Sequence, residues 1–190
     1  MAHAGNLRDL ILKKSLEVLE SRGAEELSLR EIAREIDVST AAPYKHFPDG
    51  RAQVLDEVVE EGFRNLDEAM REATLAAQSN GAWARDGVGM AYLDFARKRP
   101  RLFALMFGDP GKAANPARDS AFARLSNAIR IDQAAGLCEP GDVDVISLDS
   151  WVRAHGLATL LNAGQIEPRL PAGLDVDGLT QVVFRIAPTS

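Results

Sequence analysis

Residues 27–47, LSLREIAREIDVSTAAPYKHF, constrain the fold more than any other segment, because they predict two short helices separated by only a few residues. Ser28 and Glu31 form an S-x-x-E capping box, and Leu27 and Ile32 occupy the N′ and N4 positions of a hydrophobic staple. The helix that starts there lasts about two turns before polar and β-branched residues interrupt it. A short helix, a tight turn and another short helix predict a helix-turn-helix.

Pro43 indicates where the second of these helices begins. If Thr40 is the N-cap, Pro43 is the third helical position, and the N–H that it lacks would have no partner within the helix. If Ser39 is the N-cap, one hydrogen bond of the helix is lost, so Thr40 is the predicted cap. The helix is expected to end at residues 47–50, FPDG, which form a turn sequence.

Helical periodicity continues along the rest of the chain, without the alternation that marks a strand. One helix over residues 6–22 precedes the helix-turn-helix, and a helix of about five turns starts at Arg51. Further helices are predicted over residues 81–98, 100–108, 116–136, 142–164 and 175–187. The predicted fold is all α, with a three-helix helix-turn-helix domain in residues 1–52 and a helical ligand-binding and dimerisation domain in residues 53–190.

Composition and charge exclude several classes of protein. No apolar run is long enough to span a membrane, and charged residues interrupt the first 23 residues as they would not in a signal peptide, so a cytoplasmic protein is expected. The formal net charge is −6, and residues 1–51 hold eight basic and nine acidic side chains. That balance argues weakly against nucleic acid as a partner, so the local arrangement of charge has to decide.

Residue types that carry catalysis are scarce. The three histidines, His3, His46 and His155, form no H-x-x-x-H or Glu-x-x-His pair, and no glycine-rich phosphate loop or nucleophile elbow is present. The single cysteine, Cys138, has no partner for a disulfide or a cysteine-based metal site. The sequence therefore predicts neither an enzyme nor a cofactor or metal.

The order of motifs in the N-terminal part resembles the DNA-binding domain of the TetR/AcrR family of bacterial transcriptional regulators. The resemblance covers roughly residues 7–60 and depends on the combination of Ile32-Ala33, Val38-Ser39 and Tyr44-x-His46-Phe47. WVRAHGLATLLNAG, residues 151–164, resembles the Trp-His-Gly C-terminal domain of one branch of that family, and RPRLFALMFGDP resembles the segment that usually precedes it.

Three residues depart from the family pattern. Asp37 stands where the family usually has glycine, so a residue that tolerates left-handed geometry less easily must make the turn. Gly50 is one extra residue after Phe47, and Arg51 replaces the customary lysine at the start of the fourth helix.

The resemblance implies operator DNA as a partner. The family counterparts of five residues typically contact phosphates, which fixes register without reading sequence: Ser28, Arg30, Tyr44, His46 and Arg51. The second helix of the helix-turn-helix is expected to enter the major groove and is here called the reading helix. Base contacts are predicted for three residues in or near its first turns: Thr40, Ala41 and Lys45. Phe47 is expected in the core instead. Tyr44 could also be a core residue, but polar-tipped neighbours such as Lys45 are difficult to bury with their hydrogen bonds satisfied.

Palindromic operators require two reading helices, about 34–36 Å apart, so a homodimer is expected. The last two predicted helices are apolar enough to form a four-helix bundle with a second copy, and the surplus of apolar residues can line a cavity. The predicted ligand contacts are Trp83, Phe103, Phe107, Trp151 and His155. Core packing is the simpler explanation for each of these aromatics, and a neighbouring carbonyl could satisfy His155.

The sequence thus favours a ligand-responsive repressor that binds a palindromic operator as a homodimer and is released by a small apolar effector. Repression rather than activation of transcription is assigned by analogy with the family, because some of its members activate. The alternative is a helical small-molecule carrier or interaction module of the same fold that has lost DNA binding. Asp37, the extra Gly50 and the acidic balance are the observations that support this alternative.

Overall fold

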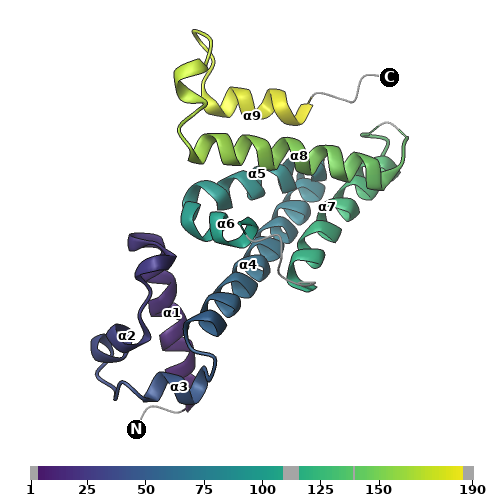
Figure 1. Cartoon of the computed structure of the whole chain (residues 1–190). Helices are drawn as coiled ribbons and strands as arrows, with labels where there is room; N and C mark the ends of the chain where they lie inside the picture. The colour runs from purple at the N-terminus through teal and green to yellow at the C-terminus, as the bar shows by residue number, and fades with distance from the viewer. Residues whose placement is uncertain (1–3, 109–115, 139, 186–190) are drawn as a thin grey trace. The chain divides into compact units, whose positions relative to one another are not determined.

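A computed structural model describes residues 4–108, 116–138 and 140–185 of the chain (Figure 1). All regular secondary structure in these ranges is helical, which confirms the predicted all-α class. In chain order the elements are α1 (Ala4–Arg22), η1 (Ala24–Glu26), α2 (Leu29–Glu35), α3 (Ala42–His46), α4 (Arg51–Asn80), α5 (Ala84–Lys98), α6 (Pro100–Phe107), α7 (Pro116–Ala134), α8 (Val143–Asn162), η2 (Glu167–Arg169) and α9 (Val176–Arg185). None of the helices in the described ranges is long and apolar enough to cross a membrane.

Contacts along the chain divide it into two compact units. The first holds α1, η1, α2, α3, the start of α4 as far as Phe63, and α6. The second holds the remainder of α4 from Arg64, together with α5, α7, α8, η2 and α9. Helix α4 therefore contributes to both units. The placement of α6 with the N-terminal helices differs from the predicted division at residue 52.

Specific contacts attach α6 to the first unit. Leu102 and Met106 are buried, and a Cβ atom at Gly62 of α4 would lie only 2.8 Å from Sδ of Met106. Arg101 Nη1 donates to the carbonyl oxygen of Glu20 on α1 at 2.8 Å, and Leu102 N donates to the Glu20 carboxylate at 3.3 Å. Glu20 thus caps the start of α6, where a negative charge is favourable.

Helix α2 begins as the sequence predicts. The Ser28 hydroxyl oxygen accepts a hydrogen bond from Glu31 N at 3.4 Å, as a capping residue does. Leu27 and Ile32, the two residues of the predicted staple, are both buried. The local signals in residues 27–32 are thus sufficient to place this helix start.

Asp37 makes the turn after α2 in the left-handed region, with φ of 54°. Its N–H donates to the carbonyl of Arg34 at 3.2 Å, and Val38 N–H donates to the carbonyl of Ala33 at 2.9 Å. These two bonds form a Schellman motif, which usually contains glycine at this position. Aspartate is among the few other residues that adopt this conformation readily.

The predicted start of α3 is wrong by about one residue. Thr40 does not cap the helix, which begins at Ala42 after Ala41, a residue with helical φ and ψ and no capping side chain. The physical reason is a turn in which Ala42 N–H donates to the carbonyl of Ser39 at 2.9 Å, so the backbone satisfies a donor that a Thr40 hydroxyl would otherwise have to satisfy. Pro43 occupies one of the first two helical positions, where it removes no hydrogen bond.

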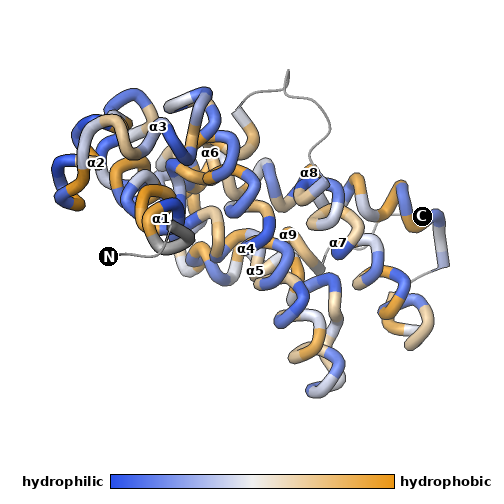
Figure 2. The backbone as a smooth tube through the Cα atoms, turned by 90° about the horizontal axis from the view of Figure 1, so that it is seen from below, coloured by the Kyte–Doolittle hydropathy of each residue, from blue (hydrophilic) through white to orange (hydrophobic). Residues whose placement is uncertain are grey.

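Each helix buries one side, and Figure 2 shows hydrophobic and hydrophilic residues interleaved along the labelled helices. In the first unit the fully buried side chains include Phe47, as predicted, and Phe63. The Arg8 guanidinium lies 5.4 Å from the centroid of the Phe47 ring and pairs with Glu57 of α4. The short helices α2 and α3 are therefore stabilised mainly by packing on this core, because helices of this length are unstable in isolation.

Ser15 of α1 is fully buried, and its hydroxyl has no hydrogen-bond partner among the described residues. Because an unsatisfied buried hydroxyl is unfavourable and alanine has the higher helix propensity, Ser15→Ala is expected to raise the free energy of unfolding by about 1 kcal/mol. Urea unfolding would measure the change. Ser21→Ala, which removes an exposed hydroxyl that donates to the Glu17 carbonyl at 2.7 Å, is the matched control and should bring no such gain. A destabilised Ser15→Ala variant would contradict the expectation.

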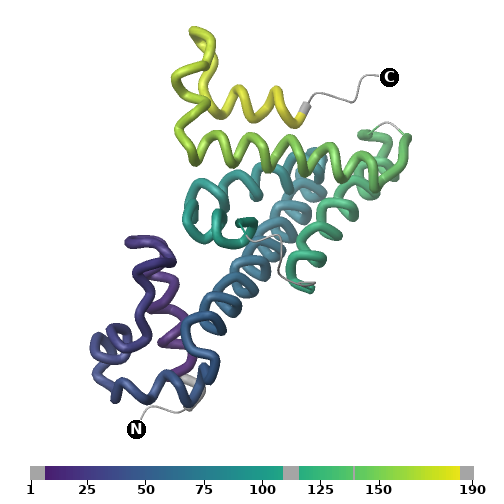
Figure 3. The backbone as a smooth tube through the Cα atoms, in the orientation of Figure 1, coloured from purple at the N-terminus to yellow at the C-terminus, as the bar shows by residue number. Residues whose placement is uncertain are grey.

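In the second unit, α5 packs against α7, α8 and α9. Helices α8 and α9 lie side by side along part of their length (Figure 3). Arg124 of α7 makes a two-pronged ion pair with Asp67 of α4, at 2.9 and 3.0 Å. The hydroxyls of Ser126 and Ser147 bond each other at 2.9 Å in the interior, so α7 and α8 are joined by a polar contact as well as by apolar packing.

Asp132 supplies the cap of a helix to which it does not belong. Its side chain, on α7, is 1% exposed, and its two carboxylate oxygens accept hydrogen bonds from Ala84 N at 2.8 Å and Arg85 N at 2.9 Å. Both donors are the first free N–H groups of α5. A carboxylate at a helix N-terminus is favoured by charge as well as by hydrogen bonding.

Candidate nucleic-acid interface and ligand groove

Helices α2 and α3, with the turn between them, present most of the predicted DNA contacts on the surface. Six of the eight residues are exposed, and five of these lie on α2, on α3 or in the turn between them: Arg30, Thr40, Ala41, Tyr44 and Lys45. His46 is half-buried at the end of α3. The buried residues Pro43 and Phe47 fix the opposite side of α3, which holds the exposed side chains in place. Whether they contact DNA stays a prediction.

The remaining two predicted contacts also serve the fold. The Ser28 oxygen accepts the capping hydrogen bond at the start of α2, and its hydroxyl proton remains to donate to another group. Arg51 Nη2 donates to the carbonyl of Ala24 in η1 at 2.7 Å, although the side chain is exposed. Arg51 thereby connects the start of α4 to the connection between α1 and α2, and its other N–H groups remain available as donors.

The extra Gly50 explains how Tyr44 is positioned. Gly50 has φ of 64° and is buried, and its N–H donates to the Phe47 carbonyl at 2.9 Å. A Cβ atom at this residue would lie 3.5 Å from Cε1 of Tyr44, so the tyrosine ring packs on the glycine. With 43% of its surface exposed, Tyr44 has its ring held by the turn while its surface remains accessible. The departure from the family pattern is therefore compatible with the predicted contact.

Sequence reasoning missed one exposed basic residue on α2, the helix that holds Arg30. Arg34 of α2 is exposed and lies four residues after Arg30, so the two guanidinium groups share one face of the helix. The i, i+4 spacing was available in the sequence and could have identified it. Arg34 is thus a third exposed basic side chain on α2 and α3, beside Arg30 and Lys45.

The five predicted ligand contacts are divided between the two units. Phe103 and Phe107 of α6 belong to the first unit, where their ring centroids are 4.9 Å apart. Phe107 also packs edge-on against Phe63 at 5.3 Å. Ring contacts of this kind are typical of core residues, so core packing is a simpler explanation for Phe103 and Phe107 than ligand binding.

Trp151 and His155 form a second cluster, on α8. Tyr92 Oη and His155 Nδ1 are 2.8 Å apart, and the His155 ring lies 5.8 Å from that of Trp151. Trp151 in turn packs edge-on against Phe122 at 6.0 Å. Burial raises the pKa of the Tyr92 hydroxyl and lowers the pKa of His155, so both groups are neutral near pH 7 and a protonated Tyr92 hydroxyl can donate to the ring nitrogen.

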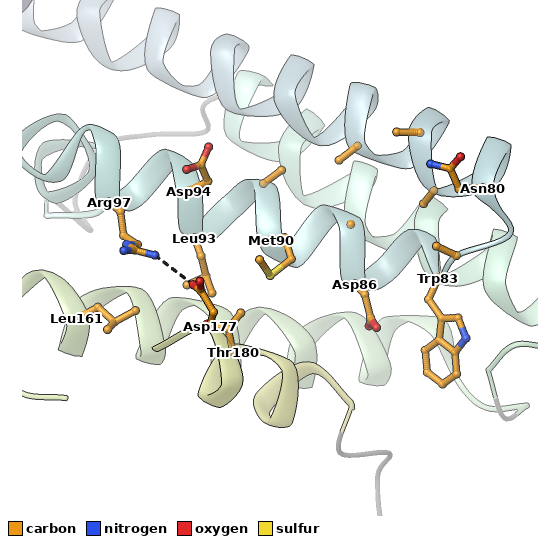
Figure 4. Close-up of a pocket in the computed structure, with 16 residues that line it drawn as sticks. Asn80, Trp83, Asp86, Met90, Leu93, Asp94, Arg97, Leu161, Asp177 and Thr180 are labelled. Carbon is orange, nitrogen blue, oxygen red and sulfur yellow. Dashed lines mark ion pairs between the residues drawn. The ribbon is translucent and has the colours of Figure 1, made fainter. Parts of the chain in front are cut away.

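Trp83 alone of the five lines a groove of about 1090 Å³ in the second unit (Figure 4). Residues from α4, α5, α8 and α9 form it, and much of its lining consists of small residues: Ala73, Ala76, Ala77, Ala82, Gly87 and Ala91. Arg97 of α5 and Asp177 of α9 form an ion pair across it, with 3.7 Å between the charged atoms. Sequence reasoning missed the residues around Trp83 because they come from four separate helices.

Among the residues that the structure describes, no group of three or more histidine, cysteine, aspartate or glutamate side chains is placed to hold a metal ion. The side chains of both surfaces offer hydrogen bonds, charge and apolar contact. The first presents basic and polar groups on a helix-turn-helix, and the second presents a groove with charged residues and an apolar lining.

Two family models match the chain over most of its length. Residues 11–58 match the model for bacterial regulatory proteins of the tetR family, and residues 86–184 match the model for the tetracyclin repressor-like C-terminal domain. The chain belongs to the TetR family. As a TetR-family protein it is a DNA-binding transcriptional regulator and not an enzyme. The Trp-His-Gly subtype of the C-terminal domain stays a prediction.

Solved structures of similar proteins agree with the TetR-family fold. A protein of unknown function from Rhodococcus sp. RHA1 is 34% identical, with a TM-score of 0.81 over 97% of this chain and 96% of that one. The putative regulatory protein SCO4313 is 25% identical, with a TM-score of 0.71 over 95% and 94% of the two chains. The TetR family transcriptional regulator PfmR from Thermus thermophilus shares the fold at 17% identity, with a TM-score of 0.62 over 95% and 99%. No curated protein matches the chain.

Proposed function

We propose that this TetR-family protein is a ligand-responsive repressor that binds a palindromic operator as a homodimer. A small, largely apolar effector in the C-terminal unit releases it from the operator. The observation that carries the DNA-binding part is the surface of α3 and the turn before it. Thr40 and Ala41 are exposed in the turn, and Lys45 is exposed on a helix whose opposite side is buried. A helix held in this way can enter the major groove while α2 braces across the backbone.

The dimer proposal is supported by apolar side chains that stay exposed on the last two long helices. On α8 they recur at helical spacing, and one more lies on α9: Val145, Leu148, Val152, Leu160 and Val182. Their exposed fractions range from 46% to 66%. A stripe of this kind on α8 is suited to an isologous contact with the same stripe of a second copy.

The effector proposal is supported by the course of α4. At one end this helix follows the turn after α3, and near its other end Ala73, Ala77 and Asn80 line the groove. One continuous helix therefore contributes both to the first unit, which holds the helix-turn-helix, and to the groove. If the effector binds the DNA-free form more tightly, DNA must weaken effector binding by the same factor.

Selection from random duplex DNA at moderate salt, followed by sequencing, tests the proposal. Enrichment of a palindrome is the expected result, and it would also provide the operator for later experiments. Recovery of no motif, at low salt as well, would overturn DNA reading and favour the carrier of the same fold. Salt-dependent retention on a polyanionic resin provides a second measurement, because a carrier should not show it.

Variants of α3 separate phosphate contacts from base contacts. Tyr44→Phe keeps the ring on Gly50 and removes only the hydroxyl, so it is expected to weaken binding to all sequences by about three- to tenfold, and His46→Ala should act similarly. Lys45→Ala is expected to relax the preference at one operator position by about tenfold. Affinities for the operator and for single-position variants provide the measurement. Uniform losses for all three variants would contradict the assignment of Lys45 to base reading.

A further inference from the structure

Gly156 lies in the interior of α8, where no feature of the helix itself requires glycine. It precedes Asn162, the last residue of the helix, by more than a turn, and it is not among the glycines with positive φ. It is therefore neither a C-cap nor a turn residue. Glycine in a helix interior is less favourable than alanine, because it loses more conformational freedom on folding. Its presence there calls for a packing reason.

Other helical glycines in the chain show what such a reason looks like. At Gly89, for example, a Cβ atom would lie 2.6 Å from the ring of Phe184, so the glycine lets α9 pack closely on α5. A Cβ atom would likewise have a neighbour at 2.6 to 3.1 Å at each of four helical glycines: Gly62, Gly87, Gly89 and Gly178. At Gly156 the same atom would meet, beyond its own helical backbone and chain neighbours, no heavy atom of the described residues within 4 Å.

The open space at Gly156 is on the exposed apolar side of α8. Three large apolar side chains and this glycine follow one another at intervals of four residues, which places them in one row along the helix surface: Leu148, Val152, Gly156 and Leu160. The three side chains are between 46% and 59% exposed. The opposite side of α8 is buried in the second unit through Ala154, Leu157, Ala158 and Leu161.

A gap in a row of side chains allows a second helix to approach closely. Packed helices place the side-chain rows of one between the rows of the other, and the distance between their axes, about 8–10 Å, depends on the side chains at the contact. At Gly156 no side chain separates the backbone of α8 from a neighbour. Val152 and Leu160, one turn away on either side, would border such a contact.

The charges beside this row favour a second copy of the same chain as the neighbour. Arg153 Nε donates to the Asp149 carboxylate at 2.8 Å, so these two charged side chains of α8 pair with each other. Two identical faces can therefore meet without bringing unpaired like charges together. A two-fold arrangement would also let each copy offer the same apolar row to the other.

We infer that a helix of a second copy crosses α8 at Gly156, and that this glycine sets how closely the two copies approach. The inference rests on the proposed homodimer and adds to it the point of closest contact. Gly156 is then a specificity-determining residue of the interface, because a partner that needs this close approach is rejected when the gap is filled.

Gly156→Ala separates a role between copies from a role within one chain. In the intact dimer the added methyl group lies in the contact, so the dissociation constant of the dimer is expected to rise about tenfold or more. In a Leu148→Glu background, which places a carboxylate in the interface and is expected to be monomeric, the same change should raise the midpoint of urea unfolding. Sedimentation over a range of concentrations measures the first effect and circular dichroism the second.

Gly156→Leu enlarges the effect and needs a control of similar size. It is expected to raise the dissociation constant about 100-fold or more, while the helix content of the single chain is retained because the space around Gly156 is open. Ala76→Leu, at an exposed alanine of α4 in the same unit, is the matched control and should leave the dissociation constant unchanged.

The outcomes distinguish this inference from the proposed function. If the unchanged chain is dimeric and both Gly156 variants keep its dissociation constant, the inference is overturned and the homodimer stands. If the unchanged chain is monomeric up to about 100 μM, the homodimer and the inference both fail. A lower unfolding midpoint for Gly156→Ala in the monomeric background would assign the glycine to the fold of the single chain and would also overturn the inference.

Discussion

Leu148→Glu is expected to convert the protein to a monomer and to weaken its binding to a palindromic operator by about 100-fold or more. Leu148 lies in the exposed apolar stripe of α8, with 52% of its surface accessible, so the substitution removes only part of the packing of a fully buried leucine. In the proposed dimer the carboxylate would be buried without a partner, which is strongly unfavourable. Two linked reading helices gain about 10²- to 10⁴-fold over one, and that gain is lost with the dimer.

Leu75→Glu is the matched control for this experiment. Leu75 lies on α4 rather than on the last two helices and is 50% exposed, so the chemical change and the starting exposure are nearly the same. Sedimentation measures the oligomeric state and a fluorescence anisotropy titration measures operator affinity. A monomeric Leu75→Glu variant, or a Leu148→Glu variant that stays dimeric, would contradict the assignment of the interface to α8.

Asp132→Ala is expected to lower the free energy of unfolding of the second unit by about 3 kcal/mol. The substitution removes a carboxylate that accepts two backbone hydrogen bonds in the interior and leaves the N–H groups of Ala84 and Arg85 without their acceptor. It also removes a negative charge from the start of α5 and leaves a small cavity. Thermal and urea unfolding monitored by circular dichroism would measure the loss.

Two further substitutions show whether the cap is responsible. Asp132→Asn keeps one oxygen acceptor at nearly the same position, so its loss should be clearly smaller than that of Asp132→Ala. Asp119→Ala removes an exposed carboxylate from the first turn of the same helix and should cost less than about 1 kcal/mol. Equal stability of Asp132→Ala and the wild type would show that the two hydrogen bonds do not stabilise α5.

The fold was predictable where its signals are local. Ser28, Glu31 and the flanking Leu27 and Ile32 lie within six residues, so the start of α2 can be recognised without knowledge of the rest of the chain. The start of α3 was misplaced because a backbone carbonyl, that of Ser39, satisfies the donor that a side-chain cap was expected to satisfy. Backbone acceptors are present at every residue and leave no mark in the sequence.

The grouping of helices was less predictable than the helices themselves. Helix α6 was recognised at residues 100–108, but its place in the first unit depends on Glu20, about eighty residues earlier, and on the missing side chain at Gly62. Neither residue differs in type from many others in the chain. Only the folded arrangement shows that the carboxylate caps a helix and that the glycine permits a close approach.

The two candidate sites differ in the same way. The predicted DNA contacts come from one continuous segment with a family resemblance, and most of them are exposed in the structure. The predicted ligand contacts were chosen for aromatic character, and only Trp83 lines the groove. Asp177 of the groove lining was missed because a surface aspartate is ordinary in sequence, and only the folded arrangement shows that it borders the groove.

The cap that Asp132 provides also relaxes the requirements on another position. Serine, threonine, aspartate, asparagine and glycine are preferred immediately before a helix, and the side chains of the first four can accept hydrogen bonds from the first N–H groups. Before α5 that position holds Trp83, which could not do so. Because an acceptor from α7 satisfies those groups, the chain is free to place a large aromatic ring at the mouth of the groove. Asp132, which does not line the groove, therefore influences which side chains can line it.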